Sequence, residues 1–301
     1  MRLRKPQSGL IIEGGEMINS KEVKEYAKKC GADLIGIASI ERFKDVPAQH
    51  NPSSIFPEAK SIIVIGRRIT RGTLRGVEEG TQFDLYSLYG DVWLQDRFLA
   101  MTTFKIAEFL EDNRYEAVPL PNLPPQVPPM GIAVRPDQPP PNVMVDFDDA
   151  AMRAGLGEIG YCGILLTPEF GPRQRFQIIL TDAKLEPNPL LKQKICDRCM
   201  ECIKNCPLDA IDSTKEKEIN ICGKKMLVAE IDYAKCTTCK NGASPNRYHP
   251  AGNPDRLAAI CVRSCIDHLE KTNKLKNKFS SPFRKRTPWK IGKREMDFYK
   301  I

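Results

Sequence analysis

The hydrophobic and polar positions of the first 113 residues predict a sheet covered by helices. The runs DLIGIAS (33–39) and SIIVIG (61–66) are short and apolar, as expected of strands, and the second is continuous enough for a buried place in a sheet. A helix is predicted over residues 91–113, where apolar residues recur on one stripe. That stripe consists of Val92, Leu99, Ile106 and Leu110.

A shorter helix is predicted before these strands. Asn19, with Glu22 three residues later, forms a capping box, and Gly31 ends the helix after Cys30. Cys30 shares a helical face with apolar residues, so we expect it to be a small buried residue rather than a reactive thiol. Those neighbours are Val23, Tyr26 and Ala27.

The chain changes character near residue 119. Residues 119–141 contain ten of the 24 prolines, which excludes a helix or a central strand. We expect an ordered loop laid over the first domain, where it could wall a cavity, and a domain linker is the alternative. Beyond it, residues 148–154 are predicted as a short helix, and residues 163–167 and 174–182 as a hairpin around PEFGP.

Four closely spaced cysteines carry the most specific chemistry. The segment CDRCMECIKNCP has the spacing C-x2-C-x2-C-x3-C-P, in which three thiolates bind one 4Fe-4S cluster and the fourth binds a neighbouring cluster. Zinc sites place two C-x2-C pairs about a dozen or more residues apart, and disulfides suit short secreted chains. The spacing therefore predicts a redox protein. The four residues are Cys196, Cys199, Cys202 and Cys206.

A second group repeats this motif with an insertion. Cys236 and Cys239 supply a C-x2-C pair, and Cys261 and Cys265 supply the C-x3-C end after 21 intervening residues. Because the last cysteine of each motif crosses to the other cluster, two mixed ligand sets are predicted. They are Cys196, Cys199, Cys202 and Cys265 for one cluster, and Cys206, Cys236, Cys239 and Cys261 for the other. Cys222 is an alternative ligand in place of Cys236 or Cys239.

Length and charge bound the remaining possibilities. The 301 residues suffice for one large core and a small second domain, and no apolar run reaches the ~18 residues of a membrane span. Residues 1–17 lack the long apolar region of a secretory signal, so we expect a cytoplasmic location, where thiolates stay reduced.

The formal charge of +8 is concentrated in residues 271–301, which hold eleven Lys and Arg against two acids. We expect this tail to pack across the surface through its aromatic residues. A contact with tRNA, a membrane surface or an acidic electron-transfer partner is the alternative. The aromatic residues are Phe279, Phe283, Trp289, Phe298 and Tyr299.

Gly155, Gly157 and Gly160 match the dinucleotide pattern G-x-G-x-x-G. That pattern requires a strand before it and a helix opening within it, whereas here a predicted helix leads in and a strand leads out. We therefore expect tight turns that let the backbone approach a flat ligand, not a nucleotide site. Cys162 follows in an apolar run and is predicted to pack in the core, with a role at the site as the alternative.

The stretch from Ala154 to Pro207 resembles the superfamily of epoxyqueuosine reductases and corrinoid reductive dehalogenases. It contains A-G-L-G-x-x-G, then L-x-T-P-x-F-G-P-R, then T-D-x-x-L, and then the two-cluster ferredoxin cysteines. Residues 24–43 and 56–66 resemble the same group more loosely. The twin-arginine leader of exported dehalogenases and the helical-repeat tail of epoxyqueuosine reductases have no counterpart in this sequence.

The resemblance implies an α/β (α+β) fold in three parts. Residues 1–190 would form a nitroreductase-like domain that binds base-off cobalamin, residues 191–270 a ferredoxin-like domain with two 4Fe-4S clusters, and residues 271–301 a basic tail. The motif residues that would line or support the corrin pocket are Gly155, Gly157, Gly160, Thr167, Gly171 and Arg173.

The resemblance also implies an acid upstream of A-G-L-G. Asp146 is the candidate proton donor, because an acid beside a cavity can have a raised pKa. The alternative is that Asp146, Asp148 and Asp149 only cap the helix at Ala150.

The leading hypothesis is a cobalamin-dependent iron–sulfur reductase of a small molecule, supplied by an external low-potential electron donor. One alternative is an electron-transfer module that serves a separate partner enzyme without binding corrinoid. The other is reduction of a modified nucleoside on tRNA, with residues 271–301 as the phosphate contact, which is not favoured.

Overall fold

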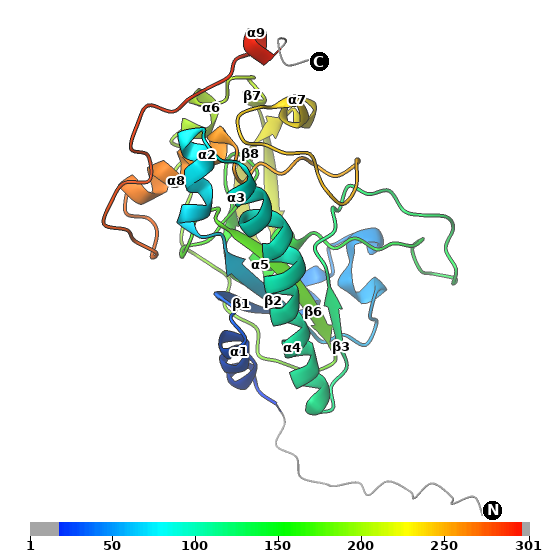
Figure 1. The fold of residues 1–301 in the computed structure, drawn as a ribbon. Coiled ribbons are helices and arrows are strands. Elements are labelled where there is room, and N and C mark those ends of the chain that lie inside the picture. Colours follow the sequence, from blue (N-terminus) through cyan, green and yellow to red (C-terminus); the bar gives the residue numbers. More distant parts are fainter. Residues whose placement is uncertain (1–17, 297–301) are drawn as a thin grey trace, which may run out of the picture.

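The computed structural model describes residues 18–296 and places a four-stranded antiparallel sheet at the centre of the molecule (Figure 1). The strand order is β1-β2-β6-β3. The strands are β1 (Leu34–Ser39), β2 (Ser61–Arg68), β6 (Gln174–Thr181) and β3 (Ala117–Leu120). Both strands predicted near the start of the chain therefore exist, and they are neighbours in the sheet with Ile37 opposite Ile63.

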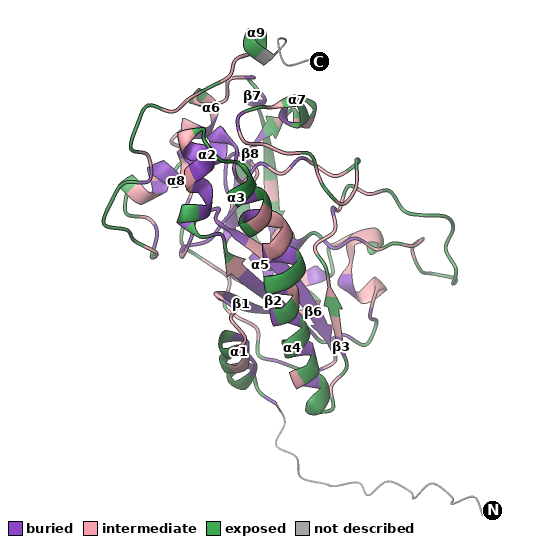
Figure 2. Ribbon diagram, in the orientation of Figure 1, coloured by how far each residue is buried: buried purple, intermediate pink, exposed green. Residues whose placement is uncertain are grey.

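The sheet is buried on both faces (Figure 2). Ile62 and Val64 of β2 belong to a core cluster with residues of helix α5 (Phe147–Arg153). Ile63 and Ile65, which alternate with them, pack with residues of two other helices, α1 (Ser20–Lys29) and α4 (Ala100–Asp112). Since successive side chains of a strand point to opposite faces, the continuous run SIIVIG suits a strand covered on both sides.

The capping box predicted for α1 is present. The Asn19 side chain accepts a hydrogen bond from the backbone N–H of Glu22, and the Glu22 carboxylate accepts one from the backbone N–H of Asn19. Gly31 follows the helix with a φ of 100°, where a side chain would be strained. Cys30 is half-buried rather than fully buried.

The helix predicted over residues 91–113 starts earlier and changes pitch on the way. The short helix α3 (Asp84–Tyr86) leads through two π-helical segments, Ser87–Val92 and Leu94–Leu99, into α4. Leu99, Ile106 and Leu110 of the predicted stripe are fully buried. The apolar pattern thus identified the buried face of the helix. It could not predict the π-helical turns, because the pattern assumes a constant 3.6 residues per turn.

The predicted hairpin of residues 163–167 and 174–182 is wrong. β5 (Leu165–Leu166) pairs with β4 (Glu158–Ile159), whereas β6 pairs with β2 and β3. A single bridge between Thr167 and Gly171 closes the turn between the two segments. β6 is buried along nearly its whole length, so a partner strand on each side satisfies its backbone groups.

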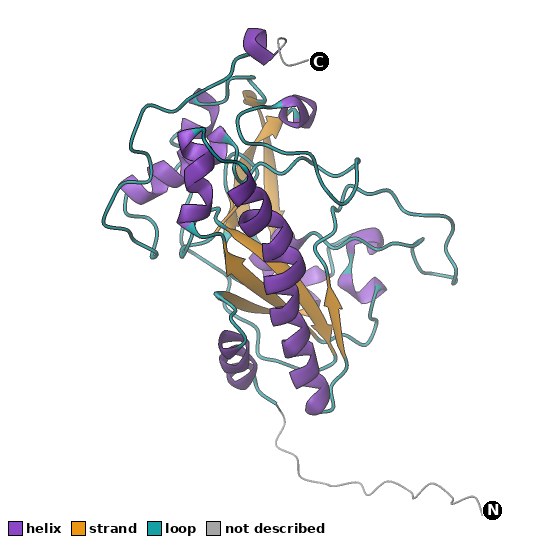
Figure 3. Cartoon of the chain, in the orientation of Figure 1, coloured by secondary structure: helices purple, strands orange, loops and turns teal. Residues whose placement is uncertain are grey.

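The other α-helices and a second hairpin form the upper part of the molecule in Figure 1, where long loops connect them (Figure 3). They are α2 (Arg75–Glu79), α6 (Glu201–Lys204), β7 (Ile211–Ile221), β8 (Lys224–Ile231), α7 (Tyr233–Thr238), α8 (Ile260–Lys271) and α9 (Lys293–Met296). β7 and β8 form an antiparallel hairpin, and its residues Ile221 and Met226 join the core cluster on the α5 side of the sheet.

The C-terminal segment packs on the surface, as predicted for residues 271–296. Phe283 is fully buried among residues that include Val77 of α2, and the indole N–H of Trp289 donates to the Val77 carbonyl at 3.0 Å. Arg284 and Arg286 form ion pairs with acids of α2. Phe298 and Tyr299, the other two aromatic residues of the prediction, lie outside the described residues. Within residues 18–296, no helix is long and apolar enough to cross a bilayer.

Candidate functional site

The cysteines of the first motif lie in a loop and a single helical turn. Cys196 and Cys199 precede α6, Cys202 lies within it and Cys206 follows it. Met200, just before α6, has a φ of 63°, which is uncommon for a residue with a side chain. This tight turn brings the loop directly into the helix.

The second group lies on two helices. Cys236 is in α7 and Cys239 follows that helix, while Cys261 and Cys265 are one turn apart on α8. Because residues i and i+4 share a helix face, α8 presents both thiols to the same side. α8 packs against α6, so elements from the two motifs meet.

Cys265 lies with the cysteines of the first motif. Burial raises the pKa of Cys265, and the neighbouring thiols that raise it further include Cys196 and Cys199. The pKa of Cys202 is raised by its hydrogen bond with Cys162 and by burial, and its neighbouring thiols include Cys265 and Cys261. The last cysteine of the second motif therefore faces the first three cysteines of the first.

Cys206 lies with the cysteines of the second motif. Burial raises the pKa of Cys236 to about 11, with contributions from Cys206 and Cys239. Burial likewise raises the pKa of Cys261 to about 12, with contributions from Cys206 and Cys236. Cys265 and Cys206 therefore each have cysteines of the other motif as neighbours, an arrangement that suits crossed ligation.

The backbone around these sulfurs suits thiolates. Cys196 Sγ accepts from the backbone N–H of Tyr161 at 3.4 Å, and Cys206 Sγ accepts from that of Ala210 at 3.3 Å. All eleven cysteines are free of disulfide bonds. Since N–H groups aimed at sulfur favour the charged thiolate, the donor set fits iron ligation.

Two other cysteines have distinct surroundings. Cys162 is buried, as predicted. A hydrogen bond with Cys202 and the nearby Arg256 lower the pKa of its thiol to about 7, although burial opposes this shift. Cys222 lies at the turn of the β7–β8 hairpin, 3.9 Å from Arg153 Nη1. The groups that act on the Cys222 thiol within the described chain are Arg153, Arg42 and acids, not cysteines, so the geometry does not support its replacing Cys236 or Cys239.

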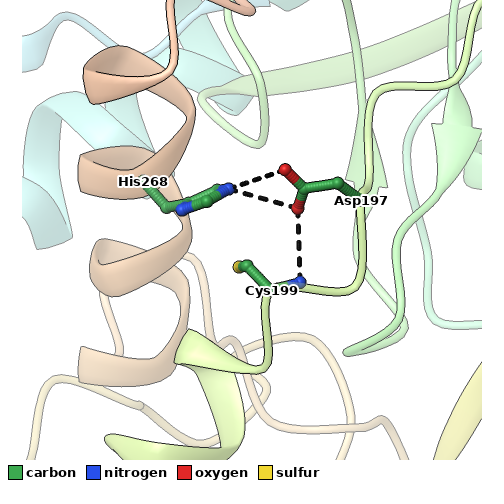
Figure 4. Close-up of side chains that lie close together, drawn as sticks. All are labelled: Asp197, Cys199 and His268. Carbon is green, nitrogen blue, oxygen red and sulfur yellow. Dashed lines mark hydrogen bonds and ion pairs between the residues drawn. The ribbon is translucent and has the colours of Figure 1, made fainter.

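The Asp197 side chain links the loop of the first motif to α8 by hydrogen bonds (Figure 4). Its carboxylate lies 2.9 Å from His268 Nε2 and 3.0 Å from Lys274 Nζ, and it accepts from the backbone N–H of Cys199 at 3.2 Å. Burial opposes ionisation, but the partners His268 and Lys274 lower the pKa of Asp197 to about 2. Ligand atoms of Asp197, Cys199 and His268 lie within 4.8 Å of one another, yet these hydrogen bonds already occupy the carboxylate.

A cavity of about 880 Å³ opens between α5, the proline-rich loop and the β7–β8 hairpin. Ile159, Val228, Ile231 and Tyr233 supply apolar wall, and charged residues line the rest. Its volume is at the upper end of the roughly 300–1,000 Å³ of small-molecule and cofactor pockets. The chain therefore offers room for a large ligand at this place.

A second, more polar cavity of about 360 Å³ adjoins the first and is lined by Arg175 and Arg256. Gly163 and Tyr233 line both cavities. Gly163 directly follows Cys162 in the chain. Through Gly163, both cavities therefore lie beside Cys162, whose thiol contacts Cys202.

The proline-rich segment is an ordered loop that walls these cavities, as predicted. Pro125 and Gln126 line both of them. The Gln126 side chain accepts from the backbone N–H of Asn253 at 3.2 Å, and Gln49 donates to the Asn142 carbonyl at 2.6 Å. The tip of the loop projects away from the body of the molecule (Figure 1).

Three neighbouring acids differ in their surroundings. Asp146 caps α5 by accepting from the backbone N–H groups of Asp148 and Asp149, and it also lines both cavities. Asp149 is bound to Arg153 at 2.6 Å. Asp148 also lines both cavities, and burial, reinforced by the charge of Asp146, raises its pKa to about 7. Sequence reasoning favoured Asp146, and only burial distinguishes Asp148.

The motif residues expected at a corrin pocket contact protein instead of the larger cavity. A Cβ on Gly157 would lie 2.2 Å from the Leu166 carbonyl oxygen, and one on Gly155 would lie 2.2 Å from that of Pro189. Arg173 is buried and donates to the Ile69 carbonyl at 2.8 Å. Within residues 18–296, both cavities are lined by residues other than these six. These six motif residues therefore pack against the protein that surrounds the cavities and do not line the cavities themselves. They are Gly155, Gly157, Gly160, Thr167, Gly171 and Arg173.

The glycine-rich turn also lacks the architecture of a nucleotide site, as predicted. α5 ends at Arg153, before the first glycine, and β4 begins at Glu158 within the pattern. The helix N-terminus that binds a pyrophosphate in dinucleotide folds is therefore not formed by this segment.

The curated proteins that share sequence with this chain include a reductive dehalogenase and an epoxyqueuosine reductase. The chain is 33% identical over 124 residues to a tetrachloroethene reductive dehalogenase of Desulfitobacterium hafniense, a match that covers 40% of this chain and 19% of that protein. It is 26% identical over 227 residues to the epoxyqueuosine reductase of Staphylococcus aureus, covering 66% of this chain and 54% of that protein. The chain thus spans about a fifth of the first relative and about half of the second. No protein-family model matches it.

Two of the solved structures that share the fold are reductive dehalogenases. One is a reductive dehalogenase described as suggesting a mechanism for B12-dependent dehalogenation, with a TM-score of 0.54 and 17% identity over 93% of this chain and 43% of that chain. The other is a variant of the catabolic reductive dehalogenase NpRdhA, with a TM-score of 0.53 and 16% identity over 90% of this chain and 41% of that chain. The likeness shows a shared mixed α/β fold.

Proposed function

Because the chain is related to reductive dehalogenases and epoxyqueuosine reductases, we propose that it is a cobalamin-dependent iron–sulfur reductase. Electrons from an external low-potential donor pass through two 4Fe-4S clusters to cobalamin, where a small molecule is reduced. Residues 1–190 are the nitroreductase-like, corrinoid-binding part, residues 191–270 the ferredoxin-like part, and residues 271–301 the tail.

The observation that carries the proposal is the position of the cysteine groups beside the two cavities. Tyr233 lines both cavities and lies three residues before Cys236 in α7. Gly163 lines both cavities and follows Cys162, whose thiol contacts Cys202. Two clusters held by these cysteines would therefore lie next to any ligand bound in the larger cavity.

The proposed cluster ligands are the two mixed sets, Cys196, Cys199, Cys202 and Cys265, and Cys206, Cys236, Cys239 and Cys261. The larger cavity is the proposed cobalamin site, since its volume and its apolar wall suit a large, flat ligand. When bound, cobalamin would supply a strongly reducing, nucleophilic cobalt centre. The glycine-rich turn holds the frame of the cavity by close backbone packing.

Asp148 is the proposed proton donor, in place of Asp146. Its pKa of about 7 keeps a large fraction of the carboxyl protonated near neutral pH, so it can give up a proton to a reduced product. Asp146 positions Asp148 by capping α5, and its charge helps to keep Asp148 protonated. Arg153 holds Asp149 in an ion pair and so leaves the proton role to Asp148.

Anaerobic reconstitution with iron, sulfide and hydroxocobalamin tests the proposal. We expect about eight iron and eight sulfide per chain, from two 4Fe-4S clusters, together with a corrinoid absorption band that stays with the protein through gel filtration. The substitution Ile219→Trp, which would place an indole ring in the larger cavity, should weaken corrinoid retention while leaving the iron content unchanged.

Two other outcomes would change the conclusion. Full iron with no retained corrinoid, and a stable complex with a separate enzyme, would favour an electron-transfer module. Zinc without acid-labile sulfide would overturn both functions.

A tRNA substrate is the second candidate, favoured by the match to an epoxyqueuosine reductase over 66% of this chain. Arg284 and Arg286 of the tail are paired with Glu78 and Glu79, so residues 271–296 offer less free positive charge than the sequence suggests. Binding of a tRNA anticodon stem-loop that weakens steeply with salt would support this candidate. Binding that is undetectable at low salt would exclude it.

A further inference from the structure

The outer face of the long helix α4 carries large apolar side chains that are exposed to solvent. The inner face packs against the sheet through Ile106 and Leu110, which are fully buried. On the outer face, Met101 is 56% exposed and Phe104 is 54% exposed. Figure 2 shows this exposed face along the helix. The outer face of α4 is therefore apolar where a solvent-facing helix would normally be polar.

The apolar face continues towards the N-terminal end of the helix. Tyr89 and Phe98, in the two π-helical segments that precede α4, are also exposed, and the Tyr89 ring packs edge-on against Trp93 with ring centres 5.0 Å apart. Four exposed side chains together offer about 400 Å² of surface. They are Tyr89, Phe98, Met101 and Phe104. An apolar patch of this size on a soluble protein often marks an interaction site.

The charges at the two ends of this patch suit a second copy of the same helix. Arg97 lies four residues before Met101, and Glu108 lies four residues after Phe104. Both charged side chains are exposed, and within residues 18–296 neither forms an ion pair, while Arg97 stacks on the Trp93 ring. Arg97 and Glu108 are about 16 Å apart along the helix, so they cannot pair with each other within one copy.

We propose that two copies of this chain associate through α4, with the two helices antiparallel about a two-fold axis that passes between Met101 and Phe104. Such an axis places Met101 of one copy against Phe104 of the other, and Arg97 of one copy against Glu108 of the other, twice each. The same surface thus supplies both the apolar and the charged partners that it lacks in a single copy.

The size of the contact is sufficient for a specific dimer. The four apolar side chains of two copies would bury about 800 Å², and the charged side chains beside them bring the interface to the roughly 1,000 Å² expected of a specific contact.

The proposed interface lies away from the candidate site. α4 and α5 cover opposite faces of the sheet, and residues of α5 line both cavities. A second copy on α4 would therefore lie across the sheet from these residues. The proposal does not depend on the proposed function, because neither iron nor a corrinoid takes part in the contact.

Sedimentation velocity of the full chain over a range of concentrations tests the proposal. The wild type should sediment as a dimer that dissociates on dilution, whereas Met101→Glu should be a monomer at concentrations at which the wild type is dimeric. Because Met101 is exposed, this substitution should leave thermal unfolding of the single chain little changed. Ile132→Glu is the matched control, since Ile132 is 82% exposed in the proline-rich loop and its substitution should leave the dimer intact.

Exchange of the two charges tests the antiparallel arrangement. Arg97→Glu alone, or Glu108→Arg alone, would place like charges opposite each other twice in the dimer, and each should raise the dissociation constant about tenfold. The double variant restores opposite charges across the two-fold axis and should return the dissociation constant to near the wild-type value.

A wild type that stays monomeric at every concentration, or a Met101→Glu protein that remains dimeric, would overturn the proposal. A double variant that dimerises no better than the single variants would also overturn it. Monomeric wild type that binds phosphatidylcholine vesicles, with binding lost in Met101→Glu, would overturn it in favour of a lipid surface as the occupant of this face.

Discussion

At the scale of single residues, burial separates side chains that look equivalent in sequence. Asp146, Asp148 and Asp149 lie within four positions, but one caps α5, one faces the cavities with a pKa of about 7, and one is bound to Arg153. The sequence predicted acids near the site, and the start of α5 already indicated that one of them caps this helix. The raised pKa depends on atoms that fold over Asp148 from distant segments, so it could not be predicted.

Asp148→Asn should remove a pH-dependent cost of folding. The Asp148 carboxyl has a pKa near 3.9 in the unfolded chain and about 7 in the folded protein. The unfolded chain therefore loses this proton first as pH rises from about 4 to 7, which lowers the free energy of unfolding by at most about 4 kcal/mol. The variant should therefore gain free energy of unfolding relative to wild type, and the gain should be larger at pH 8 than at pH 5. Urea unfolding at the two pH values measures it. Asp137→Asn, an exposed position in the proline-rich loop, is the control, and an equal gain at both pH values would contradict the prediction.

At the scale of elements, the cysteine motifs are divided between helices that the chain brings together from far apart. The spacing predicted which residues are candidate iron ligands, but α6 and α8 had to pack before Cys265 could join Cys196 and Cys199. The same limit applies to strands. The apolar run of β6 was read correctly as a strand, while its partners β2 and β3 lie more than fifty residues earlier and were missed.

Crossed ligation predicts which cysteine variants behave alike. Cys265→Ser and Cys199→Ser should alter the same one of two EPR signals in the reduced, reconstituted protein, while Cys206→Ser and Cys236→Ser should alter the other. Cys222→Ser should leave both signals and the iron content unchanged, because its thiol contacts Arg42 and Arg153. A Cys265→Ser protein that resembles Cys236→Ser would show that the ligands do not cross.

The glycine-rich turn between α5 and β4 should tolerate no side chain at its centre. A Cβ at Gly157 would lie 2.2 Å from the Leu166 carbonyl oxygen, which belongs to backbone and cannot move aside. Gly157→Ala should therefore lower the free energy of unfolding by about 2–4 kcal/mol. Gly72→Ala, with nothing within 4 Å of its new Cβ, should change it by under about 1 kcal/mol. Equal denaturation midpoints for the two variants would refute the steric explanation.

At the scale of the whole molecule, the basic tail is part of the structure. The sequence predicted that the tail packs across the surface, with a binding contact as the alternative. Phe283 is fully buried against α2 and α8, and the neighbouring arginines pair with acids of α2. The hairpin β7–β8 also packs on the first core. The proposed domains therefore share buried surface, and we expect them to unfold together.

Phe283→Ala should destabilise the whole protein. Removing a fully buried ring leaves a cavity and costs about 3–5 kcal/mol. Phe279→Ala, in the same tail, removes a ring that is 45% exposed and stacks on Arg71, so it should cost under about 1.5 kcal/mol. Thermal unfolding of the two variants compares them, and equal losses would mean that the tail is not anchored at Phe283.

The sequence by itself determined the features that depend on residues close together in the chain: the cap of α1, the apolar stripe of α4, the proline-rich loop, and two sets of cysteines with ferredoxin spacing. Tertiary structure decided the rest. It paired β5 with β4, packed the motif glycines against backbone, buried Arg256, and placed Asp148 half-buried beside the cavities. The physical reason is that spacing and caps act within a few residues, whereas strand pairing, desolvation and the placing of buried charges depend on segments that meet only when the chain has folded.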